Sequence, residues 1–195
     1  MILVVAVLAS LLLAMLRGGK LARLGQLQFR GAWLIPAAFL MQAVVVFVPG
    51  GKTRGVSDPA AILMLTSYSM LMVAVLINRR LPGMALIGMG LLLNFAVIAA
   101  NDGLMPIEPH VVATLGHGDR VQALESGYRV HQAKDVVLTR EETELWLLSD
   151  IFVIPPPFFL STAFSLGDVL LVSGIFVLMQ RYMVEPSGKG FSHAS

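Results

Sequence analysis

The sequence predicts an all-α protein, a polytopic membrane helix bundle with five transmembrane helices, and three observations carry this prediction. Hydrophobic residues make up 56% of the 195-residue chain and charged residues only 13%, whereas about a quarter of a globular domain is charged. The apolar residues fall into blocks near the ~20 residues that a helix needs to cross a bilayer. Charged residues lie between these blocks. Because lipid offers the backbone no hydrogen bonds, spans of this kind must be helical.

The five spans form one membrane domain over residues 1–183. Their approximate ranges are 1–16, 31–48, 60–78, 83–100 and 166–179. A signal peptide carries its basic residues before the apolar run, whereas here they follow it, so the first block is expected to remain as a short helix. Small residues let membrane helices pack closely, and we expect Gly88 and Gly90 to do so in the fourth span.

Basic residues in the connectors predict the orientation of the chain. The first connector, the third connector and the C-terminal tail hold Arg17, Lys20, Arg23, Arg30, Arg79, Arg80, Arg181 and Lys189. The second connector holds only Lys52 and Arg54. Since short cytoplasmic loops are rich in Lys and Arg, the N-terminus is expected outside, and residues 184–195 are expected to form a cytoplasmic tail. The predicted location is therefore the inner (plasma) membrane.

Residues 101–144 form the long connector, and they are expected to lie outside the cell as an acidic outer segment. Their number exceeds what a passive link needs. Two stretches, Asp119–Gln122 and Thr139–Glu142, have the capping-box pattern that begins a helix, and the second leads toward Trp146. The outer segment is the part of the chain expected to bind an extracytoplasmic protein or peptide partner.

A sixth apolar region, residues 145–165, is expected to form an interfacial hairpin and not a span. Pro155, Pro156 and Pro157 remove three backbone donors and disfavour a helix. Irregular backbone is not tolerated against lipid, so this region must lie at the interface or be covered by protein. It would bring Asp150 and Asp168 to the outer end of the bundle.

Ionisable groups within apolar segments are the first functional candidates in a membrane protein. Asp150 and Asp168 meet this criterion, and Asp102 lies at the outer end of the fourth span. These three carboxylates are the candidate catalytic residues. Asn94 and Asn101 are seven residues apart, which places them on nearly the same helical face, about 10 Å from each other.

Ser165 completes this predicted polar cluster, and it also supports a structural alternative. The spacing Ser165-x-x-Asp168 is a capping-box pattern, in which each residue bonds the backbone of the other at a helix start. An Asp in the first turn also complements the helix dipole. Asp150 could similarly end a helix and bind backbone amides of the proline hairpin.

Motifs spread over the second half of the chain resemble a bacterial family of small integral membrane proteins known only as a domain of unknown function. They are Asn101–Pro106, Thr139–Glu142, Leu145–Trp146, Asp150–Ile151, Pro155–Pro157 and Gly167–Val169. This resemblance implies a membrane fold and no activity.

A shorter stretch, Phe164–Asp168 followed by an apolar helix, is similar to the Phe-Asn-x-Ala-Asp motif of lipoprotein signal peptidases. Asp150–Phe152 resembles the Asp-Phe that precedes that motif. Ser165 and Gly167 replace the Asn and Ala, and no Gly-Asn-x-x-Asp-Arg motif is present to supply the second aspartate. The similarity implies an aspartic hydrolase at the outer leaflet, in which Asp168 would pair with Asp150 or Asp102. One carboxyl group would act as base toward water and the other as acid.

The remaining features exclude other classes of function. The chain has no cysteine and a formal charge of +2, so neither thiolate chemistry nor nucleic-acid binding is indicated. His110, His117 and His131 lack the i, i+4 spacing of a helical metal site, and no metal or cofactor is expected. The lipid bilayer is the first expected partner. We expect a non-enzymatic scaffold or binding protein that acts through its outer segment, with the membrane aspartic hydrolase as the alternative.

Overall fold

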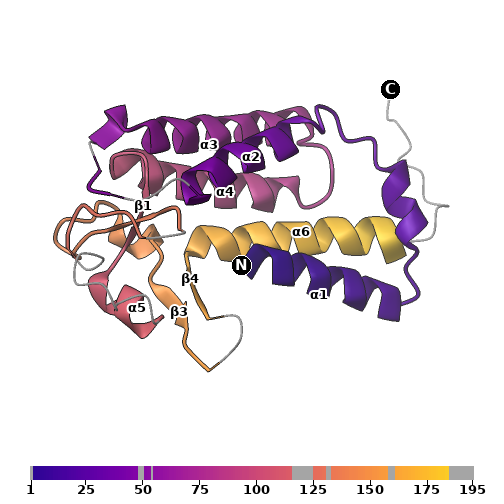
Figure 1. The fold of residues 1–195 in the computed structure, drawn as a ribbon. Coiled ribbons are helices and arrows are strands. Elements are labelled where there is room, and N and C mark those ends of the chain that lie inside the picture. Colours follow the sequence, from indigo (N-terminus) through magenta and orange to yellow (C-terminus); the bar gives the residue numbers. More distant parts are fainter. Residues whose placement is uncertain are drawn as a thin grey trace.

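The computed structural model describes residues 2–47, 51–53, 55–115, 125–130, 133–157 and 161–184. Most of this part of the chain is helical, and its long helices lie alongside one another (Figure 1). These helices are α1 (Ile2–Leu16), α2 (Leu34–Phe47), α3 (Pro59–Ile77), α4 (Met84–Ala100) and α6 (Leu166–Val184).

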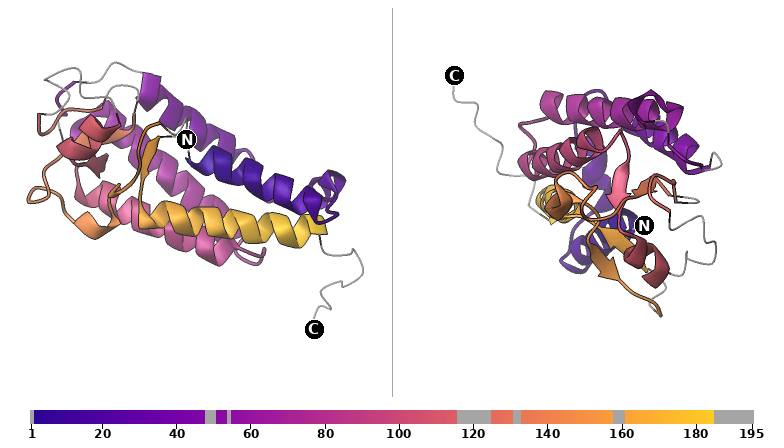
Figure 2. Two further views of the ribbon diagram at one scale, coloured as in Figure 1. Left: turned by 90° about the horizontal axis from the view of Figure 1, so that it is seen from below. Right: turned by 90° about the vertical axis from the view of Figure 1, so that its left-hand side faces the viewer.

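The long helices pack in the order α2, α3, α4, α6, α1, because these are the neighbours in extensive contact. The first helix therefore lies beside the last one (Figure 2). Both run in the same direction, since the backbone N–H of Lys20, just after α1, donates to the carbonyl of Met183 near the end of α6. This end of the bundle also holds the 3₁₀ helix η1 (Leu21–Gln26).

Close approach of α4 and α6 depends on glycine. A Cβ on Gly90 would lie 2.5 Å from the carbonyl oxygen of Gly167, and one on Gly174 would lie 2.6 Å from Cγ1 of Ile87. A Cβ on Gly88 would meet Val75 on α3 at 3.0 Å. Gly88 and Gly90 thus do permit close packing of α4, as their small size predicts.

The outer segment gathers at the opposite end of the bundle from η1 (Figure 1). The outer segment contains β1 (Met105–Ile107), α5 (Pro109–Thr114) and β2 (Asp135–Val137), and four further elements are η2 (Gly55–Ser57), η4 (Trp146–Leu148), β3 (Phe152–Ile154) and β4 (Thr162–Phe164). Strands β1 and β2 are parallel, with Met105 opposite Asp135. Strands β3 and β4 are antiparallel, with Phe152 opposite Phe164, and these two rings stack at 5.4 Å between centroids.

The predicted all-α class needs a correction for these four short strands. They form in the connectors, where the long helices leave backbone donors and acceptors to be paired. In the region expected to form a hairpin, β3 and β4 pair across the proline run. The Asp119–Gln122 pattern lies outside the described residues.

The Thr139–Glu142 stretch forms one half of the predicted capping box and not the predicted helix. Oε2 of Glu142 accepts hydrogen bonds from the backbone N–H and the hydroxyl of Thr139, both at 3.0 Å. A turn follows, and Leu145 has a φ of +55°, a left-handed conformation that interrupts an α-helix. Only the short η4 forms after it, and the indole of Trp146 donates to Oε1 of Glu108 at 2.5 Å.

The helices differ in whether their length suffices to cross a membrane. Within the described part of the chain, α3 and α6 have 19 residues each and are long and apolar enough to do so. The apolar helices α1, α2 and α4 have 15, 14 and 17 residues. By helical rise they are about 21 to 26 Å long, which is shorter than the ~30 Å hydrocarbon core.

Apolar side chains cover the outside of the bundle while polar side chains lie inside it. Large apolar residues more than 40% exposed include Leu8, Leu12, Phe39, Leu40, Ile62, Val73, Leu76, Met89, Leu92 and Val169. Polar residues no more than 9% exposed include Ser10, Ser67, Asn78, Asn94, Ser165, Asp168 and Gln180. A helix at a water-facing surface has the reverse arrangement, with a polar face toward solvent.

Candidate binding site at the outer end of the bundle

The start of α6 is fixed by a reciprocal pair of hydrogen bonds between Ser165 and Asp168. The hydroxyl of Ser165 accepts from the backbone N–H of Asp168 at 3.2 Å, and Oδ2 of Asp168 accepts from the backbone N–H of Ser165 at 3.2 Å. This is the capping box that the sequence spacing predicts, and it satisfies two donors that a helix start leaves unpaired.

Asn94 on α4 joins this cap to the neighbouring helix. Its Nδ2 donates to Oδ1 of Asp168 at 3.0 Å, and its Oδ1 accepts from the hydroxyl of Ser165 at 2.9 Å. Asn94 and Ser165 are fully buried, and Asp168 is 6% exposed. A Cβ at Gly167 would overlap Oδ1 of Asn94, so the absence of a side chain there allows the contact.

Lys134 reaches this cluster from the outer segment, one residue before β2. It is half-buried, and its charge interacts with Tyr68 on α3, Asp168, Asp150 and Asp135. Burial alone would lower the pKa of the Lys134 ammonium, but these neighbours outweigh it and hold the pKa well above its ordinary value. Lys134 therefore remains a cation beside the capped carboxylate.

Asp150 lies at the same junction, after η4, and is 4% exposed. Its backbone N–H donates to the carbonyl of Pro106 at 3.4 Å. Its Oδ1 is buried and has no hydrogen-bond partner among the described residues. Burial raises the pKa of the Asp150 carboxyl to about 8, against the attraction of Lys134 and with the added repulsion of Asp135 and Asp168. The carboxyl group is consequently protonated at neutral pH.

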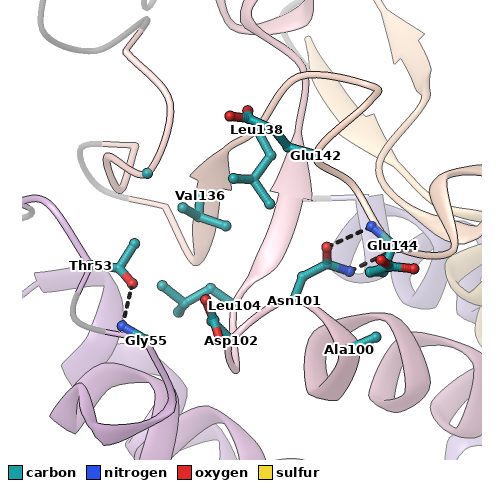
Figure 3. A pocket seen from close by; sticks show the side chains of 11 residues that line it. Thr53, Gly55, Ala100, Asn101, Asp102, Leu104, Val136, Leu138, Glu142 and Glu144 are labelled. Carbon is teal, nitrogen blue, oxygen red and sulfur yellow. Dashed lines mark hydrogen bonds between the residues drawn. The ribbon is translucent and has the colours of Figure 1, made fainter.

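Asp102 lies apart from the other two candidate carboxylates, in a separate pocket. It is exposed, with a φ of +56°, and lines a cavity of about 240 Å³ together with Gly55, Glu142 and Glu144 (Figure 3). The buried amide of Asn101 lines the same cavity, where it exchanges hydrogen bonds with the backbone of Glu144, both at 2.9 Å. The structure thus groups Asp150, Asp168, Asn94 and Ser165, but places Asp102 and Asn101 apart from them.

An apolar groove of about 220 Å³ opens beside the Lys134–Asp168 cluster. Its walls come from four helices, and α2 and α6 on its two sides are not among the helix pairs in extensive contact. Its apolar walls include Phe29, Ile35, Phe39, Leu71, Val75, Met84, Ile87, Leu91, Leu171, Ile175 and Leu178. Its polar lining residues are Gln42, Tyr68, Lys134 and Asp168.

The polar lining residues gather toward the outer end of the groove. On α6 the lining runs from Asp168 inward to Leu178, a distance of about 15 Å by helical rise. On α2, which runs in the opposite direction, Gln42 is likewise on the outer side of Ile35. The side chain of Gln42 donates to the hydroxyl of Ser67 at 3.1 Å. The groove therefore has a polar outer end and an apolar inner part.

Three residues of this site were not predicted from the sequence: Lys134, Tyr68 and Gln42. Lys134 precedes another charged residue in an already charged connector, so no local pattern indicates that it turns inward. Tyr68 and Gln42 did carry a signal, because polar side chains inside apolar spans are candidates for functional sites. Of the three histidines, only His110 lies in the described part of the chain, where its Nδ1 is 3.1 Å from Oε2 of Glu108.

Comparison with known proteins places the chain in a family. Residues 26–180 match DUF5317, a family of unknown function. The chain belongs to this family. The matched residues contain the groove and the Lys134–Asp168 cluster in full, and the match confirms the predicted resemblance to a domain of unknown function.

A relative of similar length occurs in Thermotoga maritima, where it is an uncharacterized protein. It is 26% identical to this chain over 183 residues, which cover 92% of this chain and 93% of the relative. No solved structure matches this DUF5317 protein.

Proposed function

We propose that this DUF5317 protein is a non-enzymatic plasma-membrane protein that crosses the bilayer five times and binds an amphipathic molecule with an apolar chain. The apolar groove headed by Lys134 and Asp168 carries the proposal. Ligand sites are concave and mostly apolar, with a few polar groups that fix orientation, and the groove has this composition.

The inside-out distribution of polarity supports the membrane location. All five long helices carry exposed large apolar side chains, and buried polar side chains such as Asn94 and Gln180 bond to neighbouring helices. Lipid favours this arrangement, because the helix exteriors meet hydrocarbon and polar groups must find partners inside. The short helices α1, α2 and α4 would be accommodated by local thinning of the bilayer and by long basic side chains that extend to the interface.

The distribution of charge supports an orientation with the N-terminus outside. The described acidic residues, from Asp58 to Asp168, lie in the outer connectors or at the outer helix ends. The described basic residues at the opposite end are Arg17, Lys20, Arg23, Arg30, Arg79, Arg80 and Arg181. An end rich in Lys and Arg faces the cytoplasm.

The groove suits a ligand that comes from the outer leaflet. Its polar end lies at the start of α6, where Gly167 and Asp168 meet Gly90 and Asn94 on α4, and its apolar part continues toward the inner end for about 15 Å, half of the ~30 Å hydrocarbon core. An outer-leaflet amphipath has the same polarity, with its head outward and its chain inward. Lys134 and Asp168 supply one cation and one acceptor for the head.

The absence of cysteine makes the topology straightforward to test. Single cysteines replace exposed Glu141 in the outer segment, Gly25 in η1, and Arg80 between α3 and α4. With a membrane-impermeant maleimide on intact spheroplasts, Glu141→Cys should react at once, and Gly25→Cys and Arg80→Cys only after permeabilisation. Labelling of all three in intact spheroplasts contradicts the five-span topology.

Ligand binding is tested on the purified full-length protein with a dansylated single-chain fatty acid as probe. Ile175→Trp fills the groove and should abolish the fluorescence increase on binding. Val73→Trp, on the exposed face of α3 (47% exposed), is the matched control and should bind like the wild type. Lys134→Gln should weaken binding through loss of the cation. Equal binding by all four proteins shows that the groove is not the site.

One observation favours the aspartic hydrolase as a second candidate. Asp150 and Asp168 interact electrostatically beside the same lysine, and burial raises the pKa of Asp150 to about 8, so one carboxyl could act as acid and the other as base. The capping bonds of Asp168 and the separate position of Asp102 favour binding over hydrolysis. In an assay for hydrolysis of a membrane-anchored peptide, Asp168→Asn should abolish any activity, and activity that persists in this variant excludes the mechanism.

A further inference from the structure

A third pocket lies between α1 and α6 at the inner end of the bundle, far from the groove's polar end. It has a volume of about 220 Å³ and is lined by Arg17, Phe176, Val177, Gln180, Arg181 and Val184. We call it the inner basic pocket. It belongs to neither candidate function above, and the two helices that form it lie side by side along their length (Figure 2).

The inner basic pocket is held in shape by bonds between α1, α6 and the connector that follows α1. Nη1 of Arg17 donates to Oε1 of Gln180 at 2.8 Å, and Nε2 of Gln180 donates to the carbonyl of Ser10 at 3.0 Å. Nη1 of Arg23 donates to the carbonyl of Met183 at 2.9 Å. A guanidinium has five N–H donors, so the bond to Gln180 positions Arg17 and leaves it able to bind an anion.

The positive charge around the pocket indicates that its ligand is an anion. At the inner end, the described part of the chain carries seven basic residues and no acidic one. Glu185 follows Val184 in the sequence and lies outside the described residues. Basic pockets between membrane helices on the cytoplasmic side suit anionic lipid headgroups, and guanidinium groups bind phosphate with two parallel hydrogen bonds.

The polarity of the pocket identifies a lipid as the source of this anion. Arg181 and Arg17 lie toward the inner end, whereas Phe176 and Val177 lie about one helical turn further toward the bilayer centre. Phe176 is 37% exposed. A phospholipid of the inner leaflet has the same order, with phosphate at the interface and acyl chain toward the centre.

We propose that the inner basic pocket binds the phosphate headgroup of an anionic phospholipid, with one acyl chain against Phe176 and Val177. Such a lipid would join α1 to α6 and to the connector that follows α1. This proposal relies on the five-span topology proposed above, and the cysteine-labelling experiment tests that topology separately. If labelling supports the topology and the lipid experiment below fails, the lipid site alone is rejected.

The experiment uses the full-length protein in nanodiscs of phosphatidylcholine alone or with added phosphatidylglycerol. Thermal unfolding should occur at a higher temperature with phosphatidylglycerol, and Arg17→Gln and Arg181→Gln should each lose most of this gain. In a titration with spin-labelled phosphatidylglycerol, each variant should bind about fivefold more weakly, the effect of one basic residue at a membrane surface. Arg181→Gln keeps the bond between Arg17 and Gln180, so a folding defect in Arg17→Gln does not decide the result.

Arg79→Gln is the matched control, because Arg79 is also basic, exposed and at the inner end but lies between α3 and α4. It should keep the gain from phosphatidylglycerol. Equal gains in Arg17→Gln, Arg181→Gln and the wild type overturn the proposal, and so does an equal loss in Arg79→Gln. If inorganic phosphate stabilises the detergent-solubilised protein as much as phosphatidylglycerol does, the site binds free phosphate, and the lipid assignment is wrong.

Discussion

Asn94 on α4 donates a hydrogen bond from Nδ2 to Oδ1 of Asp168 on α6, over 3.0 Å. The oxygen of the same amide accepts from the hydroxyl of Ser165. The donor and the acceptor of this one side chain therefore both bind residues at the start of α6. All three residues are buried, and buried polar groups that lose their partners cost more free energy than the bonds contribute. The pairing of α4 with α6 is thus specified by this network as well as by glycine contacts.

Replacement of Asn94 by leucine should destabilise the protein. Asn94→Leu keeps an apolar side chain of similar size but leaves Oδ1 of Asp168 and the hydroxyl of Ser165 without this partner. Each buried group left unpaired costs about 1–3 kcal/mol. Thermal unfolding in mild detergent measures the loss. Leu92→Ala on the exposed face of the same helix (51% exposed) is the control, and an equally small shift for both variants would show that the network contributes little.

The two oxygens of Asp168 accept different hydrogen bonds, and substitutions at this position measure what these bonds contribute to stability. Asp168→Asn keeps an acceptor for the backbone N–H of Ser165, whereas Asp168→Ala removes it together with the acceptor for Asn94. We expect the alanine variant to be less stable than the asparagine variant by about 1 kcal/mol, the typical value of a cap. Chemical unfolding monitored by circular dichroism provides the comparison. Both variants lack the carboxylate charge, so a reversed order of stability would mean that burying the new amide costs more than the cap contributes.

The local features of this site could be predicted from the sequence, whereas the residues brought in from a distance could not. The spacing of Ser165 and Asp168 is sufficient to predict the capping box, because both partners lie within one helical turn. Lys134 is 66 residues from Tyr68 and 34 residues from Asp168 in the sequence. Nothing in its neighbouring sequence indicates that it turns inward toward them.

The same difference applies to the fold: elements with local hydrogen bonds could be predicted from the sequence, and elements that need a distant partner could not. Apolar blocks predict the long helices, since helical hydrogen bonds are local and the blocks have helical length. The short strands escaped prediction because a three-residue strand is defined by its partner, not by its own pattern. Asp102 was expected near Asp150 and Asp168, but the turn after α4 directs it toward Gly55 and into another pocket.

Stability should fall as the pH rises from about 4 to about 8, because of Asp150. Burial raises the pKa of its carboxyl from 3.8 to about 8, so the folded state binds this proton more tightly than the unfolded state does. The stabilisation is complete below the unfolded pKa and is lost as the pH rises through the folded one. This group contributes a slope of at most about 1.4 kcal/mol per pH unit.

Asp150→Asn tests this assignment, because the amide imitates the neutral carboxyl and does not titrate. Unfolding temperatures at pH 5, 6.5 and 8 should decrease in the wild type and change less in the variant, which should be the more stable protein at pH 8. Among the described side chains, the charged groups that act on Asp150 are Lys134, Asp135 and Asp168. Lys134 keeps its proton throughout this range, since its pKa lies above its ordinary value. Parallel curves for the two proteins would assign the pH dependence to another group.

Gly90→Ala should separate α4 from α6 and disturb the site through the backbone alone. The new Cβ would lie 2.5 Å from the carbonyl oxygen of Gly167 and 2.8 Å from the backbone nitrogen of Leu171, and neither atom can move without shifting the first two turns of α6. Overpacking of this kind costs about 1–3 kcal/mol, and the shift would also strain the contact between Asn94 and Asp168.

Gly25→Ala is the matched control, because nothing lies within 4 Å of its Cβ position. We expect Gly90→Ala to lower the unfolding temperature and to weaken binding of the dansylated fatty acid, while Gly25→Ala changes neither. Unchanged stability in Gly90→Ala would mean that α4 and α6 can move apart at little cost, and the groove would then be an adaptable surface and not a preformed site.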